Sequence, residues 1–118
     1  HMARHKDREF IKIEEICERY DIPKKYLELL FHTLRQNRLI RTRRGTQGGY
    51  QLARPADQIS LASIIRLMDG ALAPTESVSQ YFFSETPIQK EQKLLDVFRE
   101  IRDYIAARLE NLTLQDLI

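Results

Sequence analysis

Apolar residues recur at helical spacing in the first third of the chain. In residues 13–20 they fall at i, i+3, i+4 and i+7, which places them on one face of a helix. Pro23 then favours the start of a second helix, because its missing N–H costs nothing there, and this helix is expected to end near Asn37. Its apolar stripe consists of Leu27, Leu30, Phe31 and Leu34. Two short helices joined by a brief turn predict a helix-turn-helix.

A β-hairpin is predicted directly after the second helix. Residues 39–43 alternate between apolar and basic side chains, and residues 50–53 form a second short strand. Three glycines within the segment Gly45–Gly49 permit positive φ, and so a tight turn between the strands. The order helix, turn, helix, hairpin is that of a winged helix-turn-helix domain, in which the hairpin is the wing.

Two more helices are predicted in the rest of the chain. Ser60 is a suitable N-cap for a helix over residues 61–68. Residues 71–86 have no clear period and predict a loop. A long helix is then expected from near Pro87 to about Asn111, with a short turn after it.

The expected fold class is mostly α with a small β-hairpin. We expect a winged helix-turn-helix domain over residues 3–70, a loop over 71–86, and a dimerisation helix with a C-terminal turn over 87–118. The long helix carries more apolar surface than a small domain covers, so pairing with a twofold-related copy would bury the excess. The alternative is that it folds back into a monomer core. The predicted dimerisation residues are Leu94, Phe98, Ile101, Ile105 and Leu109.

Composition narrows the class of protein. The 118 residues correspond to one domain, and 42% hydrophobic with 31% charged residues is typical of a folded, soluble chain. No apolar run is long enough to cross a bilayer, and no signal peptide is seen. The single cysteine, Cys17, excludes an intrachain disulfide framework and is typical of a reducing cytoplasm, where we expect the protein to work.

Charge is distributed unevenly along the chain. The net charge is only +2, but residues 29–56 contain six arginines and no aspartate or glutamate. Such a basic block inside a nearly neutral chain indicates a surface that binds a polyanion. Charge alone leaves a solvated, arginine-rich face as the alternative.

The second helix would present polar residues to DNA at its N-terminal end. The candidates there are Lys24, Lys25, Tyr26 and Glu28. The two lysines are expected to bind phosphates, and Tyr26 is either a core aromatic or a hydroxyl donor to phosphate. Glu28 is expected to accept from the exocyclic amine of cytosine, because a carboxylate near phosphates needs a compensating contact. The alternative is a solvated Glu28 paired with Lys24 or Lys25.

The wing supplies a second set of candidate DNA contacts. These residues are Arg41, Arg43, Arg44, Thr46 and Gln47. An arginine at a hairpin tip can enter the minor groove, where negative potential is focused. The alternative is that the strand arginines only protect the edge of the hairpin from aggregation.

The motifs together resemble a known family. The stretch 13–22, the triplet Tyr26-Leu27-Glu28 and the wing 44–53 are similar to the Rrf-type transcriptional regulators, typified by the iron–sulfur-cluster regulator, the nitric-oxide-sensing repressor and the cysteine-metabolism repressor. Later segments agree over nearly the whole chain from Phe10 onward. They are Ile64-Ile65-Arg66, Leu72-Ala73-Pro74 and Leu112-Thr113-Leu114. The resemblance implies a base-reading role for Glu28 and a minor-groove role for Arg44.

Two departures from the family pattern change these expectations. The family usually begins with an additional helix, of which Ala3–Lys6 resembles the end; we expect the chain to lack the rest, with His1-Met2 as a cloning remnant. Cluster-binding members carry three cysteines before the long helix, whereas residues 74–89 contain none. We therefore expect no cluster and no other cofactor or metal. Cys17 is interpreted as a small core residue, with redox sensing as the alternative.

These patterns predict a sequence-specific DNA-binding regulator, a repressor that binds a palindromic operator in double-stranded DNA as a homodimer. The alternative is a winged-helix protein-interaction module that does not bind DNA.

An enzyme is not expected, because no nucleophile–base spacing, metal-ligand cluster or phosphate-binding glycine loop occurs. The signal stays open: it is a small ligand, a regulatory protein, or nothing beyond the abundance of the repressor. The aromatic cluster Tyr81-Phe82-Phe83 is assigned to core packing, with a pocket or a partner contact as alternatives.

Overall fold

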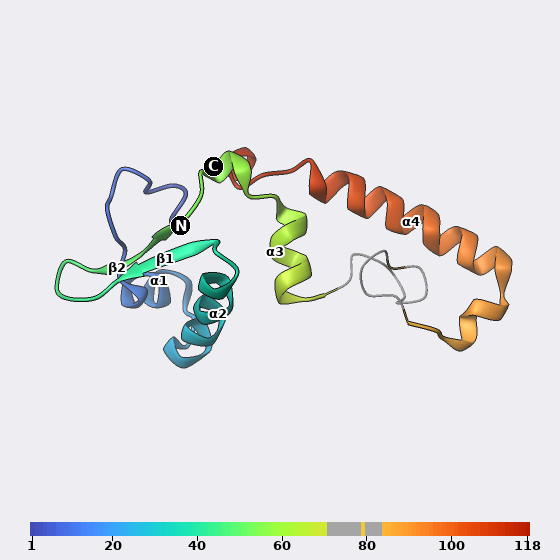
Figure 1. The fold of residues 1–118 in the computed structure, drawn as a ribbon, viewed down its shortest axis with the longest axis horizontal. Coiled ribbons are helices and arrows are strands. Elements are labelled where there is room, and N and C mark those ends of the chain that lie inside the picture. Colours follow the sequence, from blue (N-terminus) through green and yellow to red (C-terminus); the bar gives the residue numbers. More distant parts are fainter. Residues whose placement is uncertain (71–78, 80–83) are drawn as a thin grey trace. The chain divides into compact units, whose positions relative to one another are not determined.

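The computed structural model describes residues 1–70, 79 and 84–118 (Figure 1). The chain divides into two compact units, one made of residues 1–59 with 114–118 and the other of residues 60–113. The cluster Tyr81-Phe82-Phe83, the triplet Leu72-Ala73-Pro74 and most of the expected 71–86 loop lie outside the described residues.

The first two helices form where the apolar periodicity predicts them. Helix α1 spans Ile13–Tyr20 and buries Ile13 and Ile16. It ends at Asp21, whose left-handed φ of 53° turns the chain while the Ile22 amide donates to the Cys17 carbonyl. Helix α2 spans Lys24–Gln36 and buries Leu27 and Phe31. A turn of three residues therefore joins the helices, as a helix-turn-helix requires.

The end of α2 directs the chain into the hairpin. Arg38 has a positive φ of 59°, and the Leu39 amide donates to the Leu34 carbonyl at 3.0 Å. The Arg38 amide donates to the Arg35 carbonyl at 3.0 Å. This pair of bonds is a Schellman motif, which satisfies carbonyls at the helix end and brings a following apolar residue back against the last turn. Leu39 is accordingly buried.

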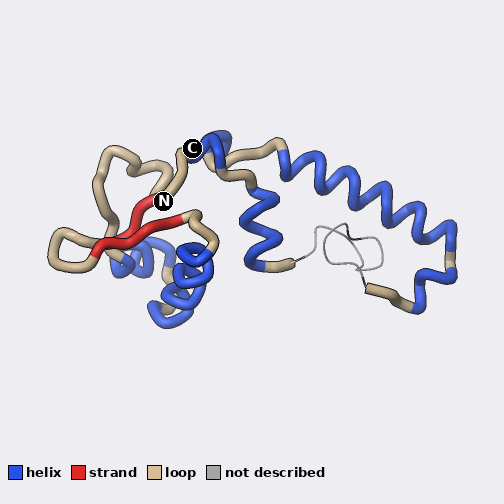
Figure 2. The backbone as a smooth tube through the Cα atoms, viewed as in Figure 1, coloured by secondary structure: helices blue, strands red, loops and turns tan. Residues whose placement is uncertain are grey.

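The predicted wing is present as an antiparallel hairpin. Strand β1 (Ile40–Arg43) pairs with β2 (Gly49–Leu52), and Figure 2 shows these two strands side by side. A further bridge joins Ile11 to Tyr50, whose amides and carbonyls exchange two hydrogen bonds of 2.8 Å. The N-terminal segment therefore adds a third extended strip to the free edge of β2, which sequence analysis did not predict.

One apolar core holds the helix-turn-helix and the wing together. It is formed by α1, α2, β1 and the bridging residue of the N-terminal segment, and the Phe31 and Tyr50 rings meet edge to face at 4.7 Å. Its buried members are Ile11, Ile13, Ile16, Leu27, Phe31 and Ile40. Because the second helix and the hairpin share this core, their exposed faces belong to one compact unit.

Two α-helices lie in the described part of the second unit. Helix α3 spans Leu61–Met68, and the Ser60 hydroxyl accepts from the Ser63 amide at 3.1 Å, which confirms the predicted N-cap. It packs against α4 (Gln92–Glu110), and Arg66 forms an ion pair of 2.6 Å with Glu110. Helix α3, which the sequence analysis grouped with residues 3–70, therefore lies in the same unit as the long helix.

The long helix begins later than predicted. Residues Pro87–Lys90 form a separate 3-10 turn, and α4 starts only at Gln92. Glu91 between them has φ −102° and ψ 84°, which interrupts the helix. The proline at residue 87 favours a helical first turn but does not specify the α form. None of the helices in the described part of the chain has the length and apolar character that a bilayer crossing requires.

Candidate nucleic-acid interface

The N-terminal half of α2 presents an exposed polar surface. Lys24, Lys25 and Glu28 are all exposed, as expected for residues on the side of the helix away from Leu27. Tyr26 is 57% exposed, so its ring is neither a core aromatic nor fully solvated. The structure thus leaves all four predicted α2 residues accessible to a partner.

One of the two lysines is already paired. Lys24 Nζ lies 2.8 Å from Glu14 Oε1 on α1, and both side chains are about half exposed. The hydrogen bond with Lys24 lowers the pKa of Glu14 below its ordinary value, and the same bond raises the pKa of Lys24. Lys25 has no acidic partner within the described ranges.

Glu28 makes neither of the intrahelical pairs considered as alternatives. The Lys24 ammonium is bound to Glu14 instead, and among residues 1–70, 79 and 84–118 no ion pair involves Glu28. Its negative charge still acts on Lys24 at longer range. Glu28 is therefore an exposed carboxylate whose acceptor capacity is available.

The wing arginines have different surroundings. Arg43 donates to the Gln47 carbonyl at 2.8 Å and pairs with Glu9 Oε2 at 3.1 Å, and its guanidinium lies 4.4 Å from the centre of the Phe10 ring. Arg44 is exposed and has no acidic partner in the described part of the chain. Although the two residues are adjacent, Arg43 is bound within the unit and Arg44 is not.

The N-terminal segment holds the wing from one side. Besides the contacts of Glu9 and Phe10 with Arg43, Lys12 Nζ donates to the Gly45 carbonyl at 2.9 Å. We call Glu9, Phe10 and Lys12 the wing brace. At the base of the wing, Arg41 donates to the Gln51 side chain, which in turn donates to the Glu9 carbonyl.

Two glycines allow the close approach of backbone in the wing. A Cβ on Gly49, which has φ +144°, would lie 2.5 Å from the Ile11 carbonyl oxygen. A Cβ on Gly48 would lie 1.9 Å from the Arg43 carbonyl oxygen. Gly45 has φ +101° but open space around its Cα. Gly49 is thus needed for the third strip of the sheet, and Gly45 only for the turn.

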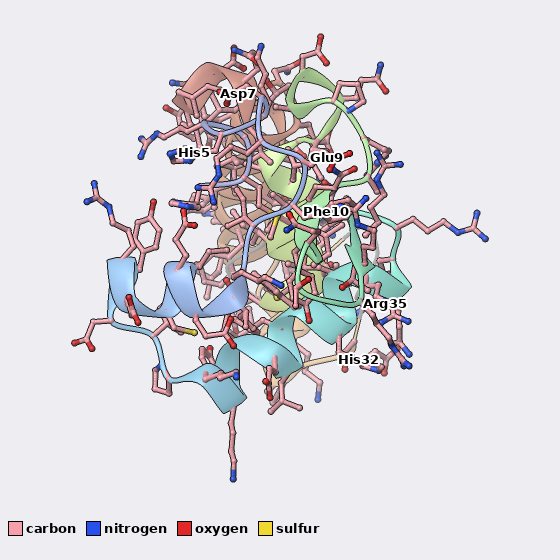
Figure 3. The ribbon with its side chains drawn as sticks, turned by 90° about the vertical axis from the view of Figure 1, so that its left-hand side faces the viewer. His5, Asp7, Glu9, Phe10, His32 and Arg35 are labelled. Carbon is pink, nitrogen blue, oxygen red and sulfur yellow. The ribbon has the colours of Figure 1, made fainter. Side chains whose placement is uncertain are left out.

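The arginine block is exposed and largely unbalanced. All six arginines of residues 29–56 are exposed, and in the described ranges only Arg43 pairs with a carboxylate. Figure 3 shows Arg35 and His32 projecting from the same side of α2. The electrostatic consequence is an excess of exposed positive charge on α2, on the wing and on the segments next to them.

The candidate interface also contains residues that were not among those predicted from the sequence patterns. Leu29 is 69% exposed on α2, and its position could have been read from the helical spacing, because it lies two residues from both Leu27 and Phe31. Glu9 and Lys12 reach the wing from 34 and 33 residues away, and no local sequence signal indicates these contacts. Phe10 belongs with them.

The residues present do not fit an iron–sulfur cluster. A two-iron cluster takes four ligands that are mainly thiolates, and the chain has one cysteine. Cys17 is half-buried and packs against the apolar core. Within the described ranges, no group of three or more histidine, cysteine, aspartate or glutamate side chains could hold a metal ion.

Comparisons with known proteins agree with this architecture. The chain is 36% identical over 108 residues to an HTH-type transcriptional regulator of Mycobacterium tuberculosis. The aligned residues are 91% of this chain and 65% of the relative, so the chain spans about two thirds of the length of this curated relative. Among solved structures, CymR of Bacillus subtilis, the global cysteine regulator, matches with a TM-score of 0.76 and 28% identity over 98% of this chain and 83% of that one.

A second solved structure, CymR of Staphylococcus aureus, is 36% identical and has a TM-score of 0.71, covering 98% of this chain and 84% of that one. These matches confirm the predicted mostly helical fold with a two-stranded wing and a long C-terminal helix. The Rrf2 sequence profile, described as an iron-dependent transcriptional regulator, matches residues 1–118. This chain therefore belongs to the Rrf2 family of transcriptional regulators, which are not enzymes.

Proposed function

We propose that the chain is the DNA-binding part of a homodimeric repressor that recognises a palindromic operator in double-stranded DNA. The observation that carries this proposal is the exposed arginine block on the helix-turn-helix and the wing, of which only Arg43 has a carboxylate partner in the described part of the chain. Unbalanced cations on one compact unit favour a polyanion as the partner.

In this proposal α2 is the recognition helix and lies in the major groove. The N-terminal residues of such a helix meet base edges. Lys25 binds phosphate. Lys24 also binds phosphate, either after its ion pair with Glu14 has opened or while the pair is kept. The Tyr26 hydroxyl is accessible to a phosphate. Glu28 accepts from the amine of a cytosine, a role supported by its exposure and by its having no ion pair among the described residues.

The wing contacts the neighbouring part of the duplex. Arg44 enters the minor groove, and Arg41, Thr46 and Gln47 lie within the same exposed hairpin. We assign Arg43 a different part: its bonds to Glu9 and Gln47 hold the wing in place, so that Arg44 is presented to DNA.

The exposed side of α4 supports a twofold pairing. Leu94, Val97, Ile101 and Tyr104 are exposed at spacings of three, four and three residues, which is the period of a coiled-coil seam. Of the predicted set, Leu94 and Ile101 belong to this stripe, whereas Phe98, Ile105 and Leu109 are partly buried. A dimer that binds two half-sites one DNA turn apart needs its two recognition helices to meet sites separated by about 34–36 Å.

The sign of regulation and the input are part of the same proposal. We propose that the protein represses by occupying its operator, and that it does so without a cluster of its own, because one cysteine cannot supply the ligands. The signal is then a small ligand, a regulatory protein or the amount of repressor.

The test is a titration of random and operator duplexes at several salt concentrations. If a dimer neutralises about eight phosphates, the logarithm of affinity falls with that of salt concentration at a slope near −7, since each contact contributes about −0.9. Binding with no salt dependence, or no binding to any duplex, would favour the protein-interaction module instead.

The two adjacent wing arginines make a matched pair within this test. Arg44→Ala should weaken binding to every sequence by roughly tenfold per half-site. It should also make the salt slope shallower by about 0.9 per half-site, because a cation in the minor groove displaces counterions from the DNA as a cation at a phosphate does. Arg43→Ala should weaken binding without changing the slope, because its charge already has Glu9 as a partner. An equal change of slope in both variants would show that Arg43 contacts DNA as well.

Glu28→Ala should relax sequence preference rather than abolish binding. A specific contact to one base contributes about 1–3 kcal/mol of discrimination, so one position in each half-site should become degenerate. Selection of random duplexes by wild type and variant measures this. Lys25→Ala is the control, expected to weaken all sequences alike. A uniform loss of affinity in Glu28→Ala would contradict base reading.

A further inference from the structure

Leu29 is an apolar side chain at the outermost position of the recognition helix. Successive α-helical residues are rotated by about 100°, so residue 29 lies about 200° around α2 from both Leu27 and Phe31. Those two residues are buried in the core, and Leu29 is 69% exposed. It therefore points directly away from the core, toward whatever α2 binds.

The neighbours of Leu29 on the helix surface are mainly polar. Lys25 lies one turn before it, and His32 and Thr33 lie one turn after it. Tyr26 is the one exposed aromatic residue nearby on α2. A stable protein–protein interface buries about 800 Å² on each partner and has an apolar centre. A leucine and a tyrosine among cations and polar groups do not make such a centre.

We propose that Leu29 is a specificity-determining residue that contacts the 5-methyl group of a thymine in the major groove. This inference rests on the proposed function, in which α2 is the recognition helix. The thymine methyl is the apolar group among the base edges that the major groove presents, and an apolar side chain facing it contributes specificity for A·T pairs. An outward leucine on a cationic helix matches that group in chemistry, and its exposure leaves it free to make the contact.

The position next to Glu28 makes the inference more specific. Glu28 and Leu29 are consecutive and point about 100° apart around the helix, so they meet different base edges. Glu28 then accepts from a cytosine and Leu29 packs on the methyl group of a thymine. One helical residue rises about 1.5 Å, and one base-pair step is about 3.4 Å. Each half-site is therefore expected to contain a cytosine and a thymine within about two base pairs of one another.

The test removes only the methyl group. After the operator has been selected with the full chain, each thymine is replaced in turn by deoxyuridine, which pairs identically but lacks the 5-methyl. At one thymine, which occurs at the same place in both half-sites, replacement by deoxyuridine should lower the affinity of wild type about fourfold per half-site. This is the factor expected for burial of one methyl group. Leu29→Ala should bind both duplexes equally, and Leu29→Met should retain part of the discrimination.

The controls separate this inference from the proposed function. Lys25→Ala should bind more weakly but keep the wild-type ratio between thymine and uracil duplexes. The role of Leu29 is overturned, while DNA binding itself stands, if Leu29→Ala still prefers thymine to uracil as strongly as wild type does. The same holds if wild type loses no affinity when any thymine is replaced by uracil. If Leu29→Ala keeps the wild-type affinity ratio between the two duplexes but sediments differently, Leu29 makes a protein contact instead. Absence of binding to any duplex overturns both proposals.

Discussion

Gly49→Ala is expected to destabilise the helix-turn-helix unit by about 2–5 kcal/mol and to abolish operator binding. Its φ of +144° is strained for any residue with a Cβ, at a cost of about 1–3 kcal/mol. The new methyl group would also lie 2.5 Å from the Ile11 carbonyl oxygen, which is backbone and cannot rotate away. The bridge between Ile11 and Tyr50 must open, and two hydrogen bonds worth about 1 kcal/mol each are lost.

Loss of this bridge reaches the DNA-binding surface through the wing brace. Glu9, Phe10 and Lys12 flank Ile11 in sequence and hold Arg43 and Gly45. When Ile11 leaves β2, these contacts can no longer form together, so the wing is no longer held in place. Hydrogen exchange at the Ile11 and Tyr50 amides should therefore be faster in Gly49→Ala than in wild type. The urea concentration at the midpoint of unfolding should also be lower.

Gly45→Ala is the matched control for this prediction. It meets the same kind of φ strain, with φ +101°, but no atom lies near the added methyl group. We expect a cost of about 1–2 kcal/mol and retention of the Ile11–Tyr50 bridge. If the two variants unfold at the same urea concentration, close approach of Ile11 to Gly49 does not contribute to stability.

Ile101→Asp is expected to convert a dimer into monomers and to lower affinity for the palindromic operator by at least about 100-fold. The side chain is 41% exposed in the centre of the stripe formed by Leu94, Val97, Ile101 and Tyr104. A charge buried in a dimer seam without a partner is strongly unfavourable. Separate monomers lose the effective concentration that links the two half-sites, which contributes about 10²–10⁴ in avidity.

The measurements are sedimentation equilibrium and binding to whole and half operators. Affinity for a half-site should stay close to that of wild type, because the variant leaves the DNA-binding unit intact. Ala107→Asp places the same charge at an exposed position of α4 outside the stripe and should remain dimeric. A dimeric Ile101→Asp protein with wild-type operator affinity would exclude this face of α4 as the dimer interface.

Local patterns in the sequence predict most of the secondary structure of the first unit. The spacing of apolar residues in 13–20 predicts the bounds that α1 has. The Gly45–Gly49 turn and the Ser60 cap also form where predicted. Each of these features depends on interactions within about four residues, so the residues themselves specify them.

Contacts between distant segments decide which candidate residues are available to DNA. Residue type and spacing do not distinguish Arg43 from Arg44, and only the family resemblance singles out Arg44. The structure separates the two because Glu9, 34 residues before Arg43, pairs with Arg43 alone. The charge of Lys24 is likewise balanced by Glu14 on another helix. Neither pairing follows from residue type or spacing, since both arise only when the chain has folded.

The same reason explains the two apolar sides of α4. Residues 94–109 are apolar around much of the helix, and periodicity alone assigned Leu94, Phe98, Ile101, Ile105 and Leu109 to one stripe. The tertiary structure buries Leu95 and partly buries Phe98, and it leaves Val97 and Tyr104 exposed. The spacing of apolar residues therefore specifies that α4 is an amphipathic helix with surplus apolar surface. Packing within the unit decided which part of that surface remains for a partner, because a helical pattern records how residues are spaced and not which side another element covers.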